Sequence, residues 1–340
     1  MGLRARYDAF DRFQRRHSWL GFPLAVLQKY SDDQGGYLAA TITYYGFFSI
    51  FPLLLVATTL LGFALRGHAH LENSIVNSAL GQLPIIGHDL KLHRLHGSAF
   101  ALGLGIVLSL WSGIGVFLAA ENAMDHLWGI PFRRRPDFFH KRGRALLLLL
   151  LLGAGALGAT VLSGLGTFGA SYGIAWKIAA IALSTALDVA LFWAAFRLLT
   201  VKDVSLRCLR GGAIAAGIGW QVLQTVGGYY VGHELKHASN VYGTFASVIG
   251  LLSFIYLSAH ITLLTAEGNV VATRRLWPRS FSFVFQEPVT DADKRALEQR
   301  AKVEERRQDE RVGVEIATDA DEPPARARDS EQAPERETRT

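Results

Sequence analysis

The segment His-Glu-Leu-Lys-His at residues 233–237 has the residue types and the spacing of a zinc-hydrolase motif. On a helix, two histidines four residues apart lie on one face and can bind one zinc ion, while the glutamate polarises a bound water. Here, however, the segment is short and flanked by glycines, and the sequence assigns no third ligand. We therefore expect no metal at His233 and His237, and no resident cofactor.

Asp188 is the only charged residue within residues 178–196. If this stretch is a membrane helix, Asp188 lies about 15 Å from its start, close to the middle of the bilayer. A carboxylate at that depth costs several kcal/mol unless it is paired, protonated or hydrated. One interpretation is a hydrated polar cavity, as in a carrier, and the alternative is hydrogen bonding between helices. The candidate cavity residues are Asp188, Tyr44, Ser49, Ser112, Gln221 and Gln224.

The composition indicates which elements would position these residues. Half of the 340 residues are hydrophobic and only 19% are charged, which excludes an ordinary soluble enzyme. The single cysteine, Cys208, excludes a disulfide scaffold. A helix needs roughly 20 apolar residues to cross a bilayer, and six stretches are long enough. We predict an all-α, polytopic integral membrane protein with six transmembrane helices, at residues 38–65, 97–120, 145–172, 178–196, 211–231 and 241–266.

Three further residues bear on how these spans pack. Glu121 and Glu267 stand directly after the second and the sixth span, where a negative charge opposes the helix macrodipole. Both carboxylates therefore need partners. Pro52 falls in the middle of the first span, where its missing N–H predicts a kink. A tight turn near Gly173 is expected to separate the third span from the fourth.

The distribution of Lys and Arg predicts the orientation. Sixteen of them lie in the N-terminal segment and in the loops after spans two and four, against five in the remaining three loops. Because basic loops stay on the cytoplasmic side, we expect both termini inside and a location in the bacterial cytoplasmic membrane. The basic loops also predict contact with membrane lipids rather than with nucleic acid.

The chain divides into three parts. Residues 1–37 form a cytoplasmic segment, and its apolar positions within 19–30 recur every three or four residues, which predicts a helix in the membrane interface or, alternatively, a short buried cytoplasmic helix. Residues 38–275 form the membrane domain. Residues 276–340 form a charged, largely disordered cytoplasmic tail, in which residues 290–293 could cap a short helix running to about Arg311.

Three sequence patterns occur together: Tyr-Tyr-Gly-Phe-Phe-Ser-Ile-Phe-Pro at residues 44–52, Ala-Glu-Asn followed by Trp-Gly within residues 120–129, and Tyr-Gly-Thr at 242–244 with Ala-Glu at 266–267. Over roughly residues 20–275 the chain resembles the YihY/BrkB family of bacterial inner-membrane proteins. The resemblance implies six helices, and the family has carried the label ribonuclease BN. One departure is Thr200, where the family usually has a proline.

These observations favour a permease, a carrier or a related envelope factor that handles a small molecule. An enzyme is the alternative, either a ribonuclease by the family label or a zinc metalloprotease by the motif at residues 233–237. A structural membrane protein without a substrate is the third interpretation. The sequence does not specify a substrate, a coupling ion or an oligomeric state.

Overall fold

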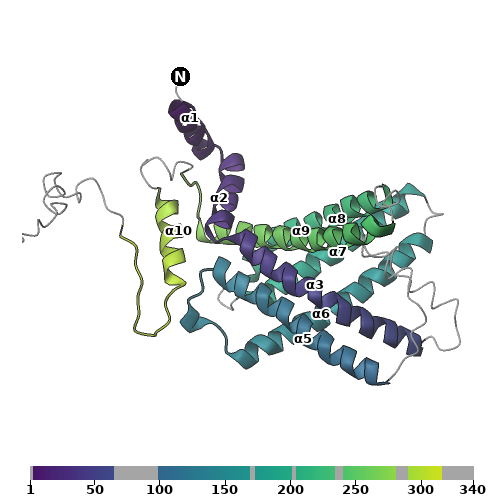
Figure 1. The fold of residues 1–340 in the computed structure, drawn as a ribbon. Helices are drawn as coiled ribbons and strands as arrows, with labels where there is room; N and C mark the ends of the chain where they lie inside the picture. The colour runs from purple at the N-terminus through teal and green to yellow at the C-terminus, as the bar shows by residue number, and fades with distance from the viewer. Residues whose placement is uncertain are drawn as a thin grey trace, which may run out of the picture.

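The computed structural model describes residues 3–64, 99–168, 173–200, 204–233, 240–280 and 290–315. Within these ranges the chain is all helical, with no strand. Six long helices form a bundle, and the short helices α1, α2 and α10 gather at one end of it (Figure 1). In chain order the α-helices are α1 (Leu3–Arg16), α2 (Ser18–Asp32), α3 (Gly35–Ala64), α5 (Ala99–Leu127), α6 (Phe138–Phe168), α7 (Ile174–Leu199), α8 (Leu206–His233), α9 (Asn240–Arg274) and α10 (Asp291–Lys302).

Each predicted span coincides with one long helix. By length and composition, three of the described helices contain a segment apolar enough to cross a membrane, at Gly103–Leu127, Ile174–Leu199 and Val248–Arg274. The protein is thus an all-α polytopic membrane protein. The exact number of six spans and the orientation stay predictions. Helix α7 begins just after Gly173, whose φ of 89° lies in the region that favours glycine.

Helices α5 and α9 extend by about two turns beyond their predicted ends. They continue past Glu121 and Glu267, to Leu127 and Arg274, instead of ending at these carboxylates. The extra turns are retained because they are buried. Leu127, at the end of α5, and Val270, on α9, are both fully buried in the main apolar core. That core lies at the end of the bundle that α2 covers, whereas many apolar side chains further along the helices are exposed at the outer surface of the bundle.

Helix α2 confirms that the predicted helix within residues 19–30 exists. It packs one face onto α9 and buries Gly21, Ala25, Val26 and Lys29. On the other side Trp19 and Leu27 are exposed. This two-sided character suits a helix that lies in the membrane interface, and its position in a membrane stays a prediction.

The tail contains a helix that packs onto this same end. Thr290 and Asp293 form a reciprocal capping box at the start of α10, as the sequence predicts, but the helix ends at Lys302 rather than near Arg311. Arg279 holds it in place with ion pairs to Asp293 at 2.9 Å and to Asp32 of α2 at 2.7 Å. Burial opposes ionisation of Asp293, but hydrogen bonds from Thr290, Arg279 and the Ser280 N–H outweigh burial and lower its pKa. This clamp is therefore intact at neutral pH and weakens only as the pH falls through that lowered pKa.

A close contact between α8 and α9 depends on Gly212. Its N–H donates a hydrogen bond to Asn269 Oδ1 at 2.7 Å, and Asn269 Nδ2 donates to the Leu209 carbonyl oxygen at 3.3 Å. A Cβ atom at position 212 would lie 2.3 Å from the Thr265 carbonyl oxygen. Only glycine therefore fits at this crossing.

We predict that Gly212→Ala destabilises the protein by about 1–3 kcal/mol, because the added methyl group overpacks the α8–α9 contact. The readout is the thermal midpoint of unfolding in detergent. Gly211→Ala is the matched control, since its Cβ would lie 3.8 Å from the nearest atom, and it should be nearly neutral. Equal midpoints for the two variants would contradict the importance of this contact.

Candidate functional site

The predicted cavity residues are spread over four helices. Asp188 is partly buried on α7, and no described residue forms a hydrogen bond or an ion pair with its side chain. Val189, the next residue, packs against Gly217 of α8. Gln221 is one turn beyond Gly217, so Asp188 and Gln221 lie at similar levels on adjacent helices. Gln224, also partly buried, lies three residues further along α8.

The hydroxyl groups on α3 and α5 are bonded within their own helices. Ser49 donates to the Gly46 carbonyl oxygen at 2.8 Å, and Ser112 donates to that of Leu108, also at 2.8 Å. Tyr44 is 60% exposed on α3, beside Phe48. Pro52 lies inside α3, which continues through it. The structure describes no contact that joins these residues to Asp188, and the midplane cavity stays a prediction.

The zinc motif lies at the edge of the described chain. His233 is the last residue of α8, and its side chain is not among those the structure describes, while residues 234–237, including His237, lie outside the described residues. Within the described ranges, no group of three His, Cys, Asp or Glu side chains is placed to hold a metal ion. The expectation of no zinc at His233 and His237 is untested by these contacts.

The structure instead brings together a buried charged cluster that we call the inner cluster: Lys29, Asp33 and Glu267. Glu267 is fully buried on α9, and its Oε2 lies 3.6 Å from the Lys29 ammonium. Lys29 is also buried and is hydrogen-bonded more closely to Asp33, one turn further along α2. Neither carboxylate oxygen of Glu267 accepts a hydrogen bond from a described residue.

Lys29 joins three helices at this point. Besides the two carboxylates, its ammonium donates to the Leu127 carbonyl oxygen at 3.2 Å, at the end of α5. That carbonyl also accepts a hydrogen bond from Gln299 of α10, again at 3.2 Å. One side chain therefore connects α2, α5 and α9, and α10 is attached through the same carbonyl.

An aromatic wall borders the inner cluster. Tyr256 and His260 lie about three and two turns from Glu267 on the same stripe of α9. The His260 ring lies 4.6 Å from that of Tyr256 and 5.1 Å from that of Tyr30. Burial, with smaller effects of Tyr256 and Glu267, raises the pKa of Tyr30. The phenol therefore stays neutral, and its oxygen has no hydrogen-bond partner among the described residues.

Glu121, the second predicted carboxylate, is also buried and has its own basic partner. Its Oε1 lies 3.6 Å from Arg144 at the start of α6. One turn further along α5, Asp125 is paired with Lys141 at 3.1 Å. Glu121 and Glu267 thus each have a basic side chain within 4 Å. Glu121 and Asp125 together face three basic side chains, Arg135, Lys141 and Arg144, whereas the inner cluster has two carboxylates for one ammonium.

This imbalance has a chemical consequence. With all three groups ionised, the inner cluster carries one net negative charge in an apolar surrounding, which is unfavourable by several kcal/mol. Binding one proton would neutralise it. His126 of α5 is close enough to interact electrostatically with Asp33 and Lys29. The inner cluster is therefore a candidate proton-binding site.

Sequence reasoning did not identify the inner cluster. It counted Lys29 only among the basic residues that set the orientation, and it assigned no role to Asp33 or His260. One signal was available: Lys29 and Asp33 are four residues apart, the spacing of a helical ion pair, at the end of a helix whose other face is apolar.

The fold and the buried charges define a polytopic membrane protein with ionisable groups at one end of its helix bundle. Comparison with known proteins then identifies the family. The family model described as Virulence factor BrkB matches residues 26–280. The chain belongs to this family, as the resemblance in its sequence predicts.

Similar proteins support the location. The inner membrane protein YhjD of Escherichia coli is 26% identical over 75% of this chain and 82% of its own length. A Bacillus subtilis protein, YfkH, named as ribonuclease-like, is 24% identical over 75% of this chain and 96% of its own length. A UPF0761 membrane protein of Psychrobacter is 23% identical, and the match covers 51% of its length. No solved structure is significantly similar. The protein is a multi-pass protein of the bacterial inner membrane.

We predict that Lys29→Met destabilises the protein by about 3–5 kcal/mol, because two buried carboxylates lose their only cation. Glu267→Gln should be much less harmful, since it leaves the Lys29–Asp33 pair balanced. Thermal unfolding in detergent at neutral pH measures both. If Glu267→Gln lowers the unfolding midpoint as much as Lys29→Met, the inner cluster does not carry an excess carboxylate charge.

Proposed function

We propose that the protein is a permease-like carrier whose cytoplasmic end is closed by the inner cluster. The observation that carries the proposal is the burial of Glu267. Its carboxylate lies 3.6 Å from the Lys29 ammonium, which is closer to the carboxylate of Asp33. Ionisable groups inside a membrane helix are costly and usually serve a substrate or proton pathway. A purely structural ion pair would be expected to have matched charges and bonded oxygens.

The inner cluster is placed to respond to a proton. While Glu267 is ionised, the excess negative charge favours separation of α2, α5 and α9, which would admit water. Protonation of Glu267 removes the excess charge and favours the closed arrangement. Asp188 and Gln221, at similar levels on α7 and α8, would form the polar part of the pathway further into the bundle. This scheme couples a proton to the opening of one end.

We predict that position 221 is reached by water and position 222 is not. Cys208 is the only cysteine, so Cys208→Ser gives a background into which Gln221→Cys or Val222→Cys is introduced singly. A hydrophilic, membrane-impermeant maleimide is added to either face of membrane vesicles. Gln221 is partly buried, whereas Val222 is 56% exposed at the outer surface of the bundle and should contact lipid. The Gln221→Cys variant should react and the matched Val222→Cys variant should not.

The same measurement tests the role of Glu267. Labelling of Gln221→Cys from the cytoplasmic face should increase from acidic to alkaline pH, and the increase should be absent when Glu267→Gln is added. If Gln221→Cys is as unreactive as Val222→Cys from both faces at every pH, the proposal of a carrier fails. If it reacts but Glu267→Gln leaves the pH dependence unchanged, the inner cluster is not the proton-responsive closure.

A further inference from the structure

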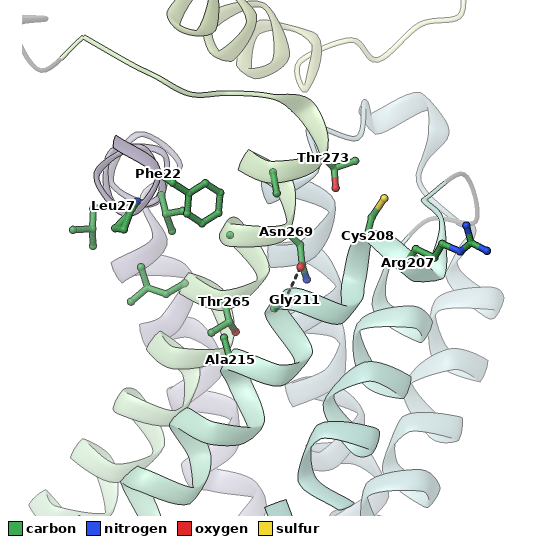
Figure 2. Close-up of a pocket in the computed structure, with 15 residues that line it drawn as sticks. Phe22, Leu27, Arg207, Cys208, Gly211, Ala215, Thr265, Asn269 and Thr273 are labelled. Carbon is green, nitrogen blue, oxygen red and sulfur yellow. Dashed lines mark hydrogen bonds between the residues drawn. The ribbon is translucent and has the colours of Figure 1, made fainter. Parts of the chain in front are cut away.

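A groove of about 780 Å³ lies between α2 and the adjoining ends of α8 and α9. Figure 2 shows Phe22 and Leu27 of α2 on one side and Gly211, Ala215 and Thr265 on the other. Its volume is within the range of about 300–1,000 Å³ typical of sites for small molecules. The groove is bounded by two predicted membrane spans and by the predicted interfacial helix, so it faces the region where the inner leaflet would lie.

Apart from Arg207, which also lines it, the groove offers its occupant little hydrogen bonding. The side chain of Asn269 is already bonded to the Gly212 N–H and the Leu209 carbonyl oxygen, and the Thr265 hydroxyl donates to the Ile261 carbonyl oxygen of its own helix. A peptide segment would bring backbone N–H and C=O groups that find no partner here. A hydrocarbon chain has no such groups. The lining therefore favours an acyl chain.

A second pocket, of about 1430 Å³, adjoins the groove. Cys208 and Thr273 line both, and in Figure 2 they lie together at one end of the groove. The second pocket is enclosed by the 128–134 segment, the end of α9 and α10, and it is basic. Its charged residues are Arg133, Arg134, Arg274, Arg295, Lys302 and Arg311, with only Glu298 and Glu305 as acids.

Three of these arginines are available to a ligand. Arg133 is paired with Glu305 at 2.6 Å, and Arg295 donates to the Arg275 carbonyl oxygen. The guanidinium groups of Arg134, Arg274 and Arg311, by contrast, have no hydrogen-bond or ion-pair partner among the described residues. Arginine suits phosphate because its planar fork can donate two parallel hydrogen bonds. The second pocket thus has unused phosphate-binding capacity next to an apolar groove.

We propose that the two pockets together bind one anionic phospholipid of the inner leaflet. One acyl chain lies in the groove between α2, α8 and α9, and the phosphate headgroup is held by Arg134 and Arg274. The bound lipid would fasten α2 and α10 to the bundle at the same end as the inner cluster. This site is separate from the carrier pathway and does not depend on it.

The test uses the full-length protein in neutral detergent, titrated with phosphatidylglycerol or with phosphatidylcholine and followed by native mass spectrometry and thermal unfolding. Phosphatidylglycerol should bind and raise the unfolding midpoint, and phosphatidylcholine should do so far less. The double variant Arg134→Gln/Arg274→Gln should weaken binding by about fivefold for each arginine removed. Arg210→Gln is the matched control, because Arg210 is exposed on α8 and lies outside both pockets.

A second pair of variants tests the acyl chain. A Cβ atom at Gly268, which lines the groove, would meet no atom within 4 Å, so Gly268→Leu is chosen to place a side chain in the groove. It should abolish binding of phosphatidylglycerol while the protein remains folded. Gly153→Leu on α6, where a Cβ atom likewise meets no atom within 4 Å, should bind like the wild type.

Three results would overturn the proposal. Undiminished binding to Gly268→Leu would show that no chain occupies the groove. Equal losses in Arg210→Gln and in the double variant would indicate general attraction to a basic surface. Equal stabilisation by glycerol phosphate, which has no acyl chain, would indicate a site for a free phosphate and not for a lipid.

Discussion

The contact between the Lys29 ammonium and the two carboxylates of Asp33 and Glu267 organises one end of this protein. Three buried charges in an apolar setting are tolerated only while they remain together, because separating any one leaves an uncompensated ion. The Lys29 side chain reaches across from α2 to α9 and to the last carbonyl of α5. The need to keep these three charges together therefore fixes the position of α2 against the ends of α5 and α9.

The rest of that end is built around the same helices. Helix α2, once fixed by Lys29, presents Asp32 to Arg279, and Arg279 in turn holds the capping residue Asp293 of α10. The groove lies beside the same face of α2, where Phe22 and Val26 border α8 and α9. The inner cluster, the attachment of α10 and the proposed lipid site would thus all depend on α2. A movement of α2 would therefore change the contacts at each of them.

Hydropathy alone predicted the long helices, because a membrane span must be apolar over its whole length wherever its neighbours lie. The capping box at Thr290 was equally visible, since it depends on residues three apart. The need for partners at Glu121 and Glu267 followed from helix electrostatics, but the identity of those partners did not. Lys29 lies in a different helix, far away in the chain, and only the packing of α2 on α9 brings it to Glu267. For Asp188, the depth in the membrane could be predicted by counting residues along one helix. Its neighbours could not be predicted, because they depend on how the adjacent helices are rotated about their axes.

The most direct test of the charge balance is a double-mutant comparison on the unfolding free energy. If two carboxylates compete for one ammonium, removing Glu267 should relieve part of the damage done by removing Lys29. We therefore expect Lys29→Met/Glu267→Gln to be more stable than Lys29→Met alone, by about 1–3 kcal/mol, since one uncompensated buried carboxylate has been removed. A double variant that is as unstable as the sum of its two single variants would contradict the account, because Glu267 would then act independently of Lys29.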